Sequence, residues 1–230
     1  MTTEFDQIYV ITFVKNANRR KFMINQFDML NISNYNFIYG IDINSLQDLL
    51  FNSEKHAYYG NNLSYNIHGL SCGIAHLTAL QHAQSHKYNK ILICEDDIKF
   101  INDINYIKYL FNNHPKDADI IRFNTTLFNN INNIDKNLIV DNLYYDGIFF
   151  GNPAGATCYG IYNTETINNM IDSYIHKSII ADWLDKFDSY KIYSTIKMPC
   201  IETTHQKIDK YYKYNDDNLY FDYENNLLIP

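Results

Sequence analysis

Several features that mark secreted, membrane-spanning or nucleic-acid-binding proteins are missing from this chain of 230 residues. No apolar run reaches the ~20 residues needed to cross a membrane, and the polar, acidic start MTTEFDQ is unlike a signal peptide. The net charge of −7 argues against broad binding of nucleic acid. We therefore expect a cytoplasmic protein with no transmembrane segment and no nucleic-acid partner.

The chain is also poor in cysteine, with four residues far apart and no CxxC pair. This spacing argues against a thiolate zinc site. Three of the four lie among apolar or small residues, which is typical of buried, reduced thiols. Reduced thiols agree with the reducing environment of the cytoplasm. The four are Cys72, Cys94, Cys158 and Cys200.

Hydrophobic residues make up 46% of the sequence, which is enough for a folded core. The length suits a single domain over residues 1–230, with a C-terminal tail from residue 201. β-Branched and aromatic residues over 7–13 predict a strand, apolar residues at helical intervals follow Asn18, and 36–39 predicts another strand. Strand, helix and strand in this order predict an α/β fold with a mostly parallel sheet flanked by helices.

The rest of the chain continues this alternation. Further strands are expected over 90–97, 118–123, 144–150, 156–162 and, as the last, 191–196. Helices are expected over 44–51, 68–86, 103–111 and 164–174, and irregular segments over 56–67 and 124–141. The expected N-caps of three helices are Asn18, Ser71 and Thr164.

The most informative stretch is KILICEDDIKF, where an apolar run leads into Glu95, Asp96 and Asp97. Such a run suits a strand buried on both faces, and acids at its end lie where ligands of open α/β sheets bind. Because side chains alternate along a strand, Glu95 and Asp97 are expected on one side and Asp96 on the other. Two carboxylates on one side can share Mg²⁺ or Mn²⁺. The alternative interpretation is a helix cap or a solvated turn.

Two other positions allow more than one interpretation. Arg19 and Arg20 fall in the first turn of the first helix, where cations oppose the helix dipole unless an anion such as phosphate lies near. They are otherwise surface arginines. His76 lies among apolar residues of the helix over 68–86, where a satisfied core histidine is a commoner outcome than a ligand.

The order of these motifs resembles glycosyltransferase family 25, which contains lipooligosaccharide and procollagen galactosyltransferases. YVITF with the arginine pair resembles the family's opening strand and turn, SCGIAHLTAL its Gly-Cys-x-x-Ser-His-Leu helix, and ILICEDD its Leu-Glu-Asp-Asp strand. GATCYGIYN and Asp182-Trp183 resemble two later motifs, so the resemblance covers about residues 7–200. The family's Glu, second Gly and Ser in the helix motif are replaced here by Gly69, Ser71 and Ala75.

The resemblance implies a GT-A-like (Rossmann-like) fold and an inverting enzyme. Its donor would be a UDP-hexose carrying galactose or glucose, and its acceptor a hydroxyl of a glycan or glycoconjugate. The acid trio then stands where GT-A enzymes keep their Asp-x-Asp motif, with Mn²⁺ or Mg²⁺ as cofactor. The resemblance leaves open a peripheral association with a membrane.

The same resemblance assigns roles to single residues. Glu95 and Asp97 are expected as metal ligands, with Asp97 favoured, and Asp96 as a partner of donor hydroxyls. The other donor-binding candidates are Thr12 and Phe13 for base and ribose, Arg20 for the diphosphate and Asp42 for the ribose.

Inversion needs a base that takes a proton from the acceptor hydroxyl. Asp182 is the candidate, because it follows an apolar run and stands beside the only tryptophan, Trp183. Its alternative interpretation is a helix N-cap. His205 is expected to complete the metal shell, or otherwise to be a surface histidine.

Two other functions stay open at this point. A nucleotidyltransferase also uses strand-end acids and metal, but VKNANRRK after the first strand lacks the glycine of a phosphate loop. A sugar-binding or scaffold protein with a decayed site would explain the changes at Gly69, Ser71 and Ala75.

Overall fold

The structure of the chain is a computed structural model. It describes residues 4–41, 63–100, 104–124, 137, 139–146, 157–177, 190–196, 199–202, 220–222 and 227–229. The helix expected over 44–51 and most of the irregular segment over 124–141 fall outside these residues.

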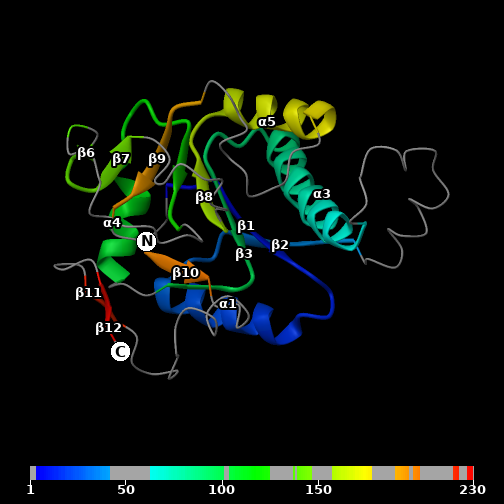
Figure 1. The fold of residues 1–230 in the computed structure, drawn as a ribbon, viewed down its shortest axis with the longest axis horizontal. Coiled ribbons are helices and arrows are strands. Elements are labelled where there is room, and N and C mark those ends of the chain that lie inside the picture. The colour runs from blue at the N-terminus through cyan, green and yellow to red at the C-terminus, as the bar shows by residue number, and fades with distance from the viewer. Residues whose placement is uncertain are drawn as a thin grey trace.

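The centre of the described fold is a sheet of eight strands in the order β2-β1-β3-β8-β5-β9-β7-β6 (Figure 1). In chain order these strands are β1 (Gln7–Thr12), β2 (Tyr35–Tyr39), β3 (Ile91–Glu95), β5 (Ile120–Arg122), β6 (Ile139–Val140), β7 (Tyr144–Asp146), β8 (Cys158–Ile161) and β9 (Ile192–Thr195). A strand lies at each position expected from the sequence; β2 begins one residue earlier than expected, and the other strands have shorter described bounds.

The expectation of a mostly parallel sheet is wrong. Three pairings are parallel (β1 with β2, β1 with β3, β5 with β9) and four are antiparallel (β3 and β5 with β8, β7 with β6 and β9). The reason is that β8 runs against both of its neighbours, β3 and β5. These two strands are therefore parallel to each other, so β1, β2, β3, β5 and β9 end at one edge. We call this edge the rim.

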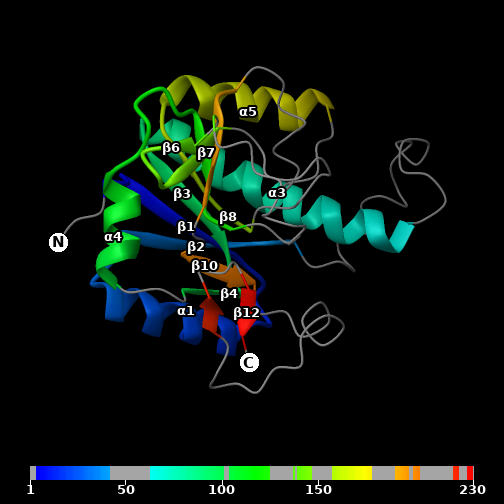
Figure 2. The same cartoon turned by 60° about the vertical axis from the view of Figure 1, so that its left-hand side comes forward.

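Helices cover both faces of the sheet. One face carries α1 (Ala17–Leu30) and α4 (Ile104–Asn112), and the other carries α3 (Leu63–Ser85) and α5 (Thr164–Lys177). Figure 2 shows α1 below the strands, with α3 and α5 above them. The chain is therefore a three-layer α/β structure.

Alternation along β1 divides its side chains between two cores. Ile8 and Val10 pack with Met23 and Phe27 of α1 in one core, whereas Tyr9 packs against α3 in the other. All five are fully buried. Burying an apolar side chain of this size stabilises the fold by about 1.5–3 kcal/mol, so β1 is held from both sides.

Helix α3 turns a face of small residues toward the sheet. Ala75, Ala79 and Ala83 are fully buried in the core between α3, α5 and the sheet. A face without large side chains lets a helix lie close to its neighbours, which fixes the height of α3 above β3. This contact positions the residues of α3 that face the rim.

The three expected N-caps are wrong by one or more residues. The N-cap of α1 is Asn16, not Asn18. Helix α3 begins at Leu63, so Ser71 lies inside it and donates a hydrogen bond to the carbonyl of Ile41 (2.8 Å). The N-cap of α5 is Asn163 rather than Thr164, because the Asn163 side chain accepts a hydrogen bond from the backbone amide of Thr166. Tertiary contacts decide among neighbouring polar residues with similar capping preference.

The acid stretch is not one continuous strand. β3 ends at Glu95, Asp96 and Asp97 form a turn, and β4 (Ile98–Phe100) follows. The side chain of Gln26 on α1 holds β4, because it donates to the carbonyl of Ile98 and accepts from the amide of Phe100. The turn is therefore fixed on both sides.

The strand over 191–196 is not the last. β10 (Cys200–Glu202) pairs antiparallel with β4, and β11 (Tyr220–Asp222) pairs antiparallel with β12 (Leu227–Ile229). None of the described helices combines the length and the apolar character that a membrane span requires.

Candidate functional site

The site is built at the rim, where β1 and β3 end side by side. These strands are parallel with Ile11 opposite Glu95, and the amide of Asp96 donates to the carbonyl of Ile11 (3.0 Å). The register therefore brings Thr12, the last residue of β1, next to the acid trio. α1 begins a few residues later, so its first turn lies at the same place.

The trio divides between the two faces of the sheet. Along β3, Ile91 and Ile93 face α3, and Glu95 continues this set toward Cys72 and His76 of α3. Asp96 points to the other side, toward the start of α1. The side chain of Asp97 does not point to the same side as Glu95, because the strand ends at Glu95 and alternation stops there. Asp97 instead contacts Arg19, which also binds Asp96. The expected pairing of Glu95 with Asp97 is therefore not the one observed.

Asp96 is held by three donors. The Thr12 hydroxyl donates to its Oδ2 at 2.5 Å, the Asn16 amide to the same oxygen at 3.0 Å, and Arg19 Nη1 to Oδ1 at 3.0 Å. The residue is only 4% exposed. A carboxylate bound by this many donors at the end of a buried strand has one fixed orientation, which is what a binding site requires.

Arg19 links the two carboxylates of the turn. Its Nη1 also lies 3.5 Å from Asp97 Oδ2, and Asp97 is 7% exposed. Partial burial lowers the pKa of Arg19, but its hydrogen bond to Asp96 and the charges of Asp97, Asp96 and Glu95 outweigh this effect and raise it. The guanidinium is therefore always charged. Nearly half of the Arg19 side chain is exposed, so it is accessible to an anionic ligand.

Arg20 has a different role from its neighbour. Its guanidinium donates to the carbonyls of Phe13 and Val14 and lies over the ring of Tyr39, 5.4 Å from the ring centre. It therefore braces the turn between β1 and α1. Phe13 in turn packs on Gly40, where an added Cβ would lie 2.6 Å from the Phe13 ring.

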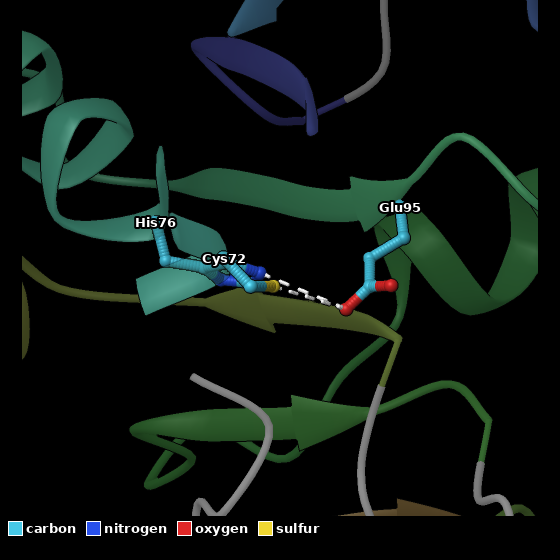
Figure 3. A group of neighbouring side chains, drawn as sticks. All are labelled: Cys72, His76 and Glu95. Carbon is cyan, nitrogen blue, oxygen red and sulfur yellow. Dashed lines mark hydrogen bonds and ion pairs between the residues drawn. The ribbon is translucent and has the colours of Figure 1, made fainter. Parts of the chain in front are cut away.

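The opposite face of β3 carries a second cluster, formed by Cys72, His76 and Glu95 (Figure 3). Glu95 Oε1 lies 3.8 Å from Cys72 Sγ and 3.9 Å from His76 Nε2. His76 is fully buried, and its Nδ1 lies 2.8 Å from the hydroxyl of Tyr159 on β8. The interpretation of His76 as a satisfied core histidine agrees with this hydrogen bond, although its other nitrogen faces a carboxylate.

The structure places six of the nine candidate residues. Five of these lie together at the ends of β1 and β3 and in the turns that follow them: Thr12, Phe13, Glu95, Asp96 and Asp97. Arg20 is adjacent but contacts backbone carbonyls rather than the acids. The other three, Asp42, Asp182 and His205, lie outside the described residues.

Sequence reasoning did not assign several residues to the site. Asn16 contacts Asp96, which only a tertiary structure shows. Arg19 is a candidate partner of an anion from the sequence, but its contacts with Asp96 and Asp97 come from the structure. Cys72 and His76 carried a usable signal, because residues four apart on a helix share a face. Both stand on the predicted helix before the acid strand.

Comparison with protein-family models gave a match that includes the strands and helices of the rim. A model described as glycosyltransferase family 25 (LPS biosynthesis protein) matches residues 5–150, more than half of the chain. The chain belongs to glycosyltransferase family 25. A search of curated proteins gave no match. The family 25 match contains β1, α1, α3 and β3, and therefore every described residue of the rim site.

Proposed function

We propose that this family 25 member is an inverting hexosyltransferase. It would transfer galactose or glucose from a UDP-sugar to a hydroxyl of a glycan or glycoconjugate, assisted by Mn²⁺ or Mg²⁺. A single GT-A-like domain is part of this proposal. The observation that carries it is Asp96, a nearly buried carboxylate fixed by three donors beside Asp97 at the rim of the sheet.

The residues at the rim suit a hard divalent cation. Asp96 and Asp97 are both nearly buried, and Arg19 supplies one positive charge against their two negative charges. Carboxylate oxygens are the ligands that Mg²⁺ and Mn²⁺ prefer. Asp97 is the leading ligand candidate and His205 the other, whereas Glu95, expected beside Asp97, faces Cys72 and His76 on the opposite side of β3. When bound, the ion would neutralise the charge that develops on the departing diphosphate.

The other rim residues supply donor contacts in this proposal. Thr12 and Phe13 lie at the end of β1, where a base and ribose would rest, and Asp96 would accept from donor hydroxyls. Arg19 is added to Arg20 as a candidate for the diphosphate, because its guanidinium is half exposed and already binds anionic oxygens. Asp42 stays a proposal for the ribose.

Asp182 is the proposed base for the acceptor hydroxyl. An Asp182→Asn variant should bind donor and lose turnover, since an amide cannot take the proton. Normal turnover in this variant would remove Asp182 from the mechanism.

The function is tested by assaying transfer and donor hydrolysis with and without Mn²⁺. Wild-type protein should release UDP from a UDP-hexose in a metal-dependent way, and Asp97→Asn should lose this activity. The matched control is Asp28→Asn, an exposed aspartate on α1, which should leave it unchanged. No donor turnover in the wild type with any UDP-hexose or acceptor would favour a decayed, sugar-binding protein instead.

A further inference from the structure

The face of β3 opposite Asp96 brings together three different metal-binding side chains. One ligand atom each from Cys72, His76 and Glu95 lies within 4.8 Å of the other two (Figure 3). We propose that this cluster is a second metal site, selective for a thiophilic cation such as Zn²⁺. The site is separate from the hard cation proposed at Asp97.

The backbone gives the cluster its shape. Cys72 and His76 are four residues apart on α3, so their side chains lie one above the other on the helix face that looks at the sheet. Glu95 is the last residue of β3 and points to the same side as Ile91 and Ile93, which pack against that helix. The small residues Ala75 and Ala79 let α3 approach the sheet closely. The three ligands are therefore held by one helix and one strand.

The distances are close to those of a tetrahedral centre. Bond lengths of about 2.0–2.3 Å from Zn²⁺ to oxygen, nitrogen and sulfur give separations of about 3.3–3.5 Å between ligand atoms. The observed separations from Glu95 Oε1 are 3.8 Å to Cys72 Sγ and 3.9 Å to His76 Nε2. A contraction of about half an ångström would bring Glu95 to bonding geometry with both, and Glu95, a quarter exposed, can make it. The third pair, Cys72 and His76, lies within 4.8 Å.

The surroundings also support a metal ligand at His76. Metal-binding histidines generally hydrogen-bond through their second nitrogen, which fixes the ring and its tautomer. Here Nδ1 lies 2.8 Å from the Tyr159 hydroxyl, and Tyr159 is hydrogen-bonded in turn to Tyr174. If the Tyr159 hydroxyl donates to Tyr174, it accepts from the Nδ1–H of His76. The lone pair of Nε2 then faces Glu95.

The ligand chemistry selects the ion. A thiolate and an imidazole favour Zn²⁺ over Mg²⁺ and Mn²⁺, which prefer oxygen. Binding would displace the Cys72 thiol proton to solvent and leave the sulfur as a thiolate. Three protein ligands leave one coordination position, as in zinc sites that exchange a bound molecule. Glu95 and Cys72 are both partly exposed, so an ion can reach the cluster from solvent.

Cobalt absorption tests this proposal directly. The full chain, freed of metal by a chelator, should bind one equivalent of Co²⁺ with a thiolate-to-cobalt charge-transfer band, and Zn²⁺ should displace it. Cys72→Ser should remove the band, whereas the control Cys200→Ala, which alters a buried cysteine on β10, should keep it. Tyr159→Phe should weaken binding about 10–100-fold by releasing His76. Absence of the band, or its persistence in Cys72→Ser, would overturn the proposal.

A second measurement needs no variant. Cys72 is the only cysteine among the described residues that is not fully buried, so an alkylating reagent should modify it first in the native chain. Zn²⁺ should protect it and Mg²⁺ should not; equal reactivity with and without Zn²⁺ contradicts the site. Asp97→Asn separates this proposal from the proposed function. That variant should lose sugar transfer and keep the cobalt band, and loss of the band would show that the cluster depends on Asp97 and would overturn the proposal of a separate site.

Discussion

Arg19 provides the sharpest test of how the rim is held together. Its Nη1 lies 3.0 Å from Asp96 and 3.5 Å from Asp97, and both carboxylates are more than nine-tenths buried. Replacing Arg19 by Gln would leave two adjacent carboxylates without their cation. Asp96 would keep Thr12 and Asn16 as donors, but the repulsion between the two acids would no longer be offset.

The magnitude follows from the burial of the three groups. Breaking a fully buried ion pair costs about 3–5 kcal/mol, whereas an exposed pair is worth about 0–1 kcal/mol. The Arg19 side chain is 45% exposed and its partners are buried, so we expect a loss of about 1–3 kcal/mol. For a chain of this size that loss lowers the melting temperature by about 2–12 °C.

A divalent cation should reverse much of this loss. If Mn²⁺ binds the rim acids, it supplies the positive charge that Arg19→Gln removes, and it stabilises by about 2.7 kcal/mol at 100 times its Kd. Denaturant unfolding with and without Mn²⁺ measures both effects. Lys21→Gln is the matched control, because Lys21 is exposed on α1 and its replacement keeps Arg19, Arg20 and both acids. Unchanged stability in Arg19→Gln, or equal Mn²⁺ stabilisation of variant and control, would refute the reasoning.

Three further predictions concern single contacts. Gly40→Ala should displace the Phe13 ring, because the new Cβ would lie 2.6 Å from it; donor binding measured by calorimetry should weaken, and unchanged affinity would exclude Phe13 from the donor site. Tyr144→Phe should cost about 1–3 kcal/mol in denaturant unfolding, because the buried hydroxyl donates to the carbonyls of Leu110 and Asn113. Burial, and then the neighbouring charge of His86, lower the pKa of His82. A lowered pKa means that the unfolded chain binds the proton more tightly than the folded chain. The free energy of unfolding should therefore fall as pH drops through and below the usual range of histidine. His82→Gln should make the free energy of unfolding less dependent on pH in that range.

The sequence predicted the elements of the fold better than their directions. Alternating strand and helix patterns located β1, β3, α4 and α5 to within a few residues, because apolar periodicity is a local property. The antiparallel course of β8 depends on which strands flank it, and no local pattern encodes that choice. The N-cap of α1 was predicted at the wrong residue for a related reason. Asn16 is the N-cap, but its side chain hydrogen-bonds to Asp96 rather than to a backbone amide of α1.

The acid trio shows where alternation can be trusted. It assigned Glu95 and Asp96 to opposite faces correctly, because β3 is regular up to Glu95. It failed for Asp97, because the turn that begins at Asp96 changes the direction of the chain. The resemblance identified the family correctly, and the contacts of Arg19 with Asp96 and Asp97 were the part that only the tertiary structure could show.

The division of the trio has a consequence for mutagenesis of this family member. Asp96 and Asp97 contact Arg19 near α1, whereas Glu95 contacts a cysteine and a histidine on α3. Neighbouring carboxylates therefore lie in two different environments, one with a guanidinium and the other with a thiol and an imidazole. Replacing all three together would remove both environments and could not tell which one supports transfer. Single substitutions separate them: an effect of Glu95→Gln that Cys72→Ser reproduces would come from the α3 side. An effect that only Asp97→Asn reproduces would come from the rim, where the donor diphosphate is proposed to bind.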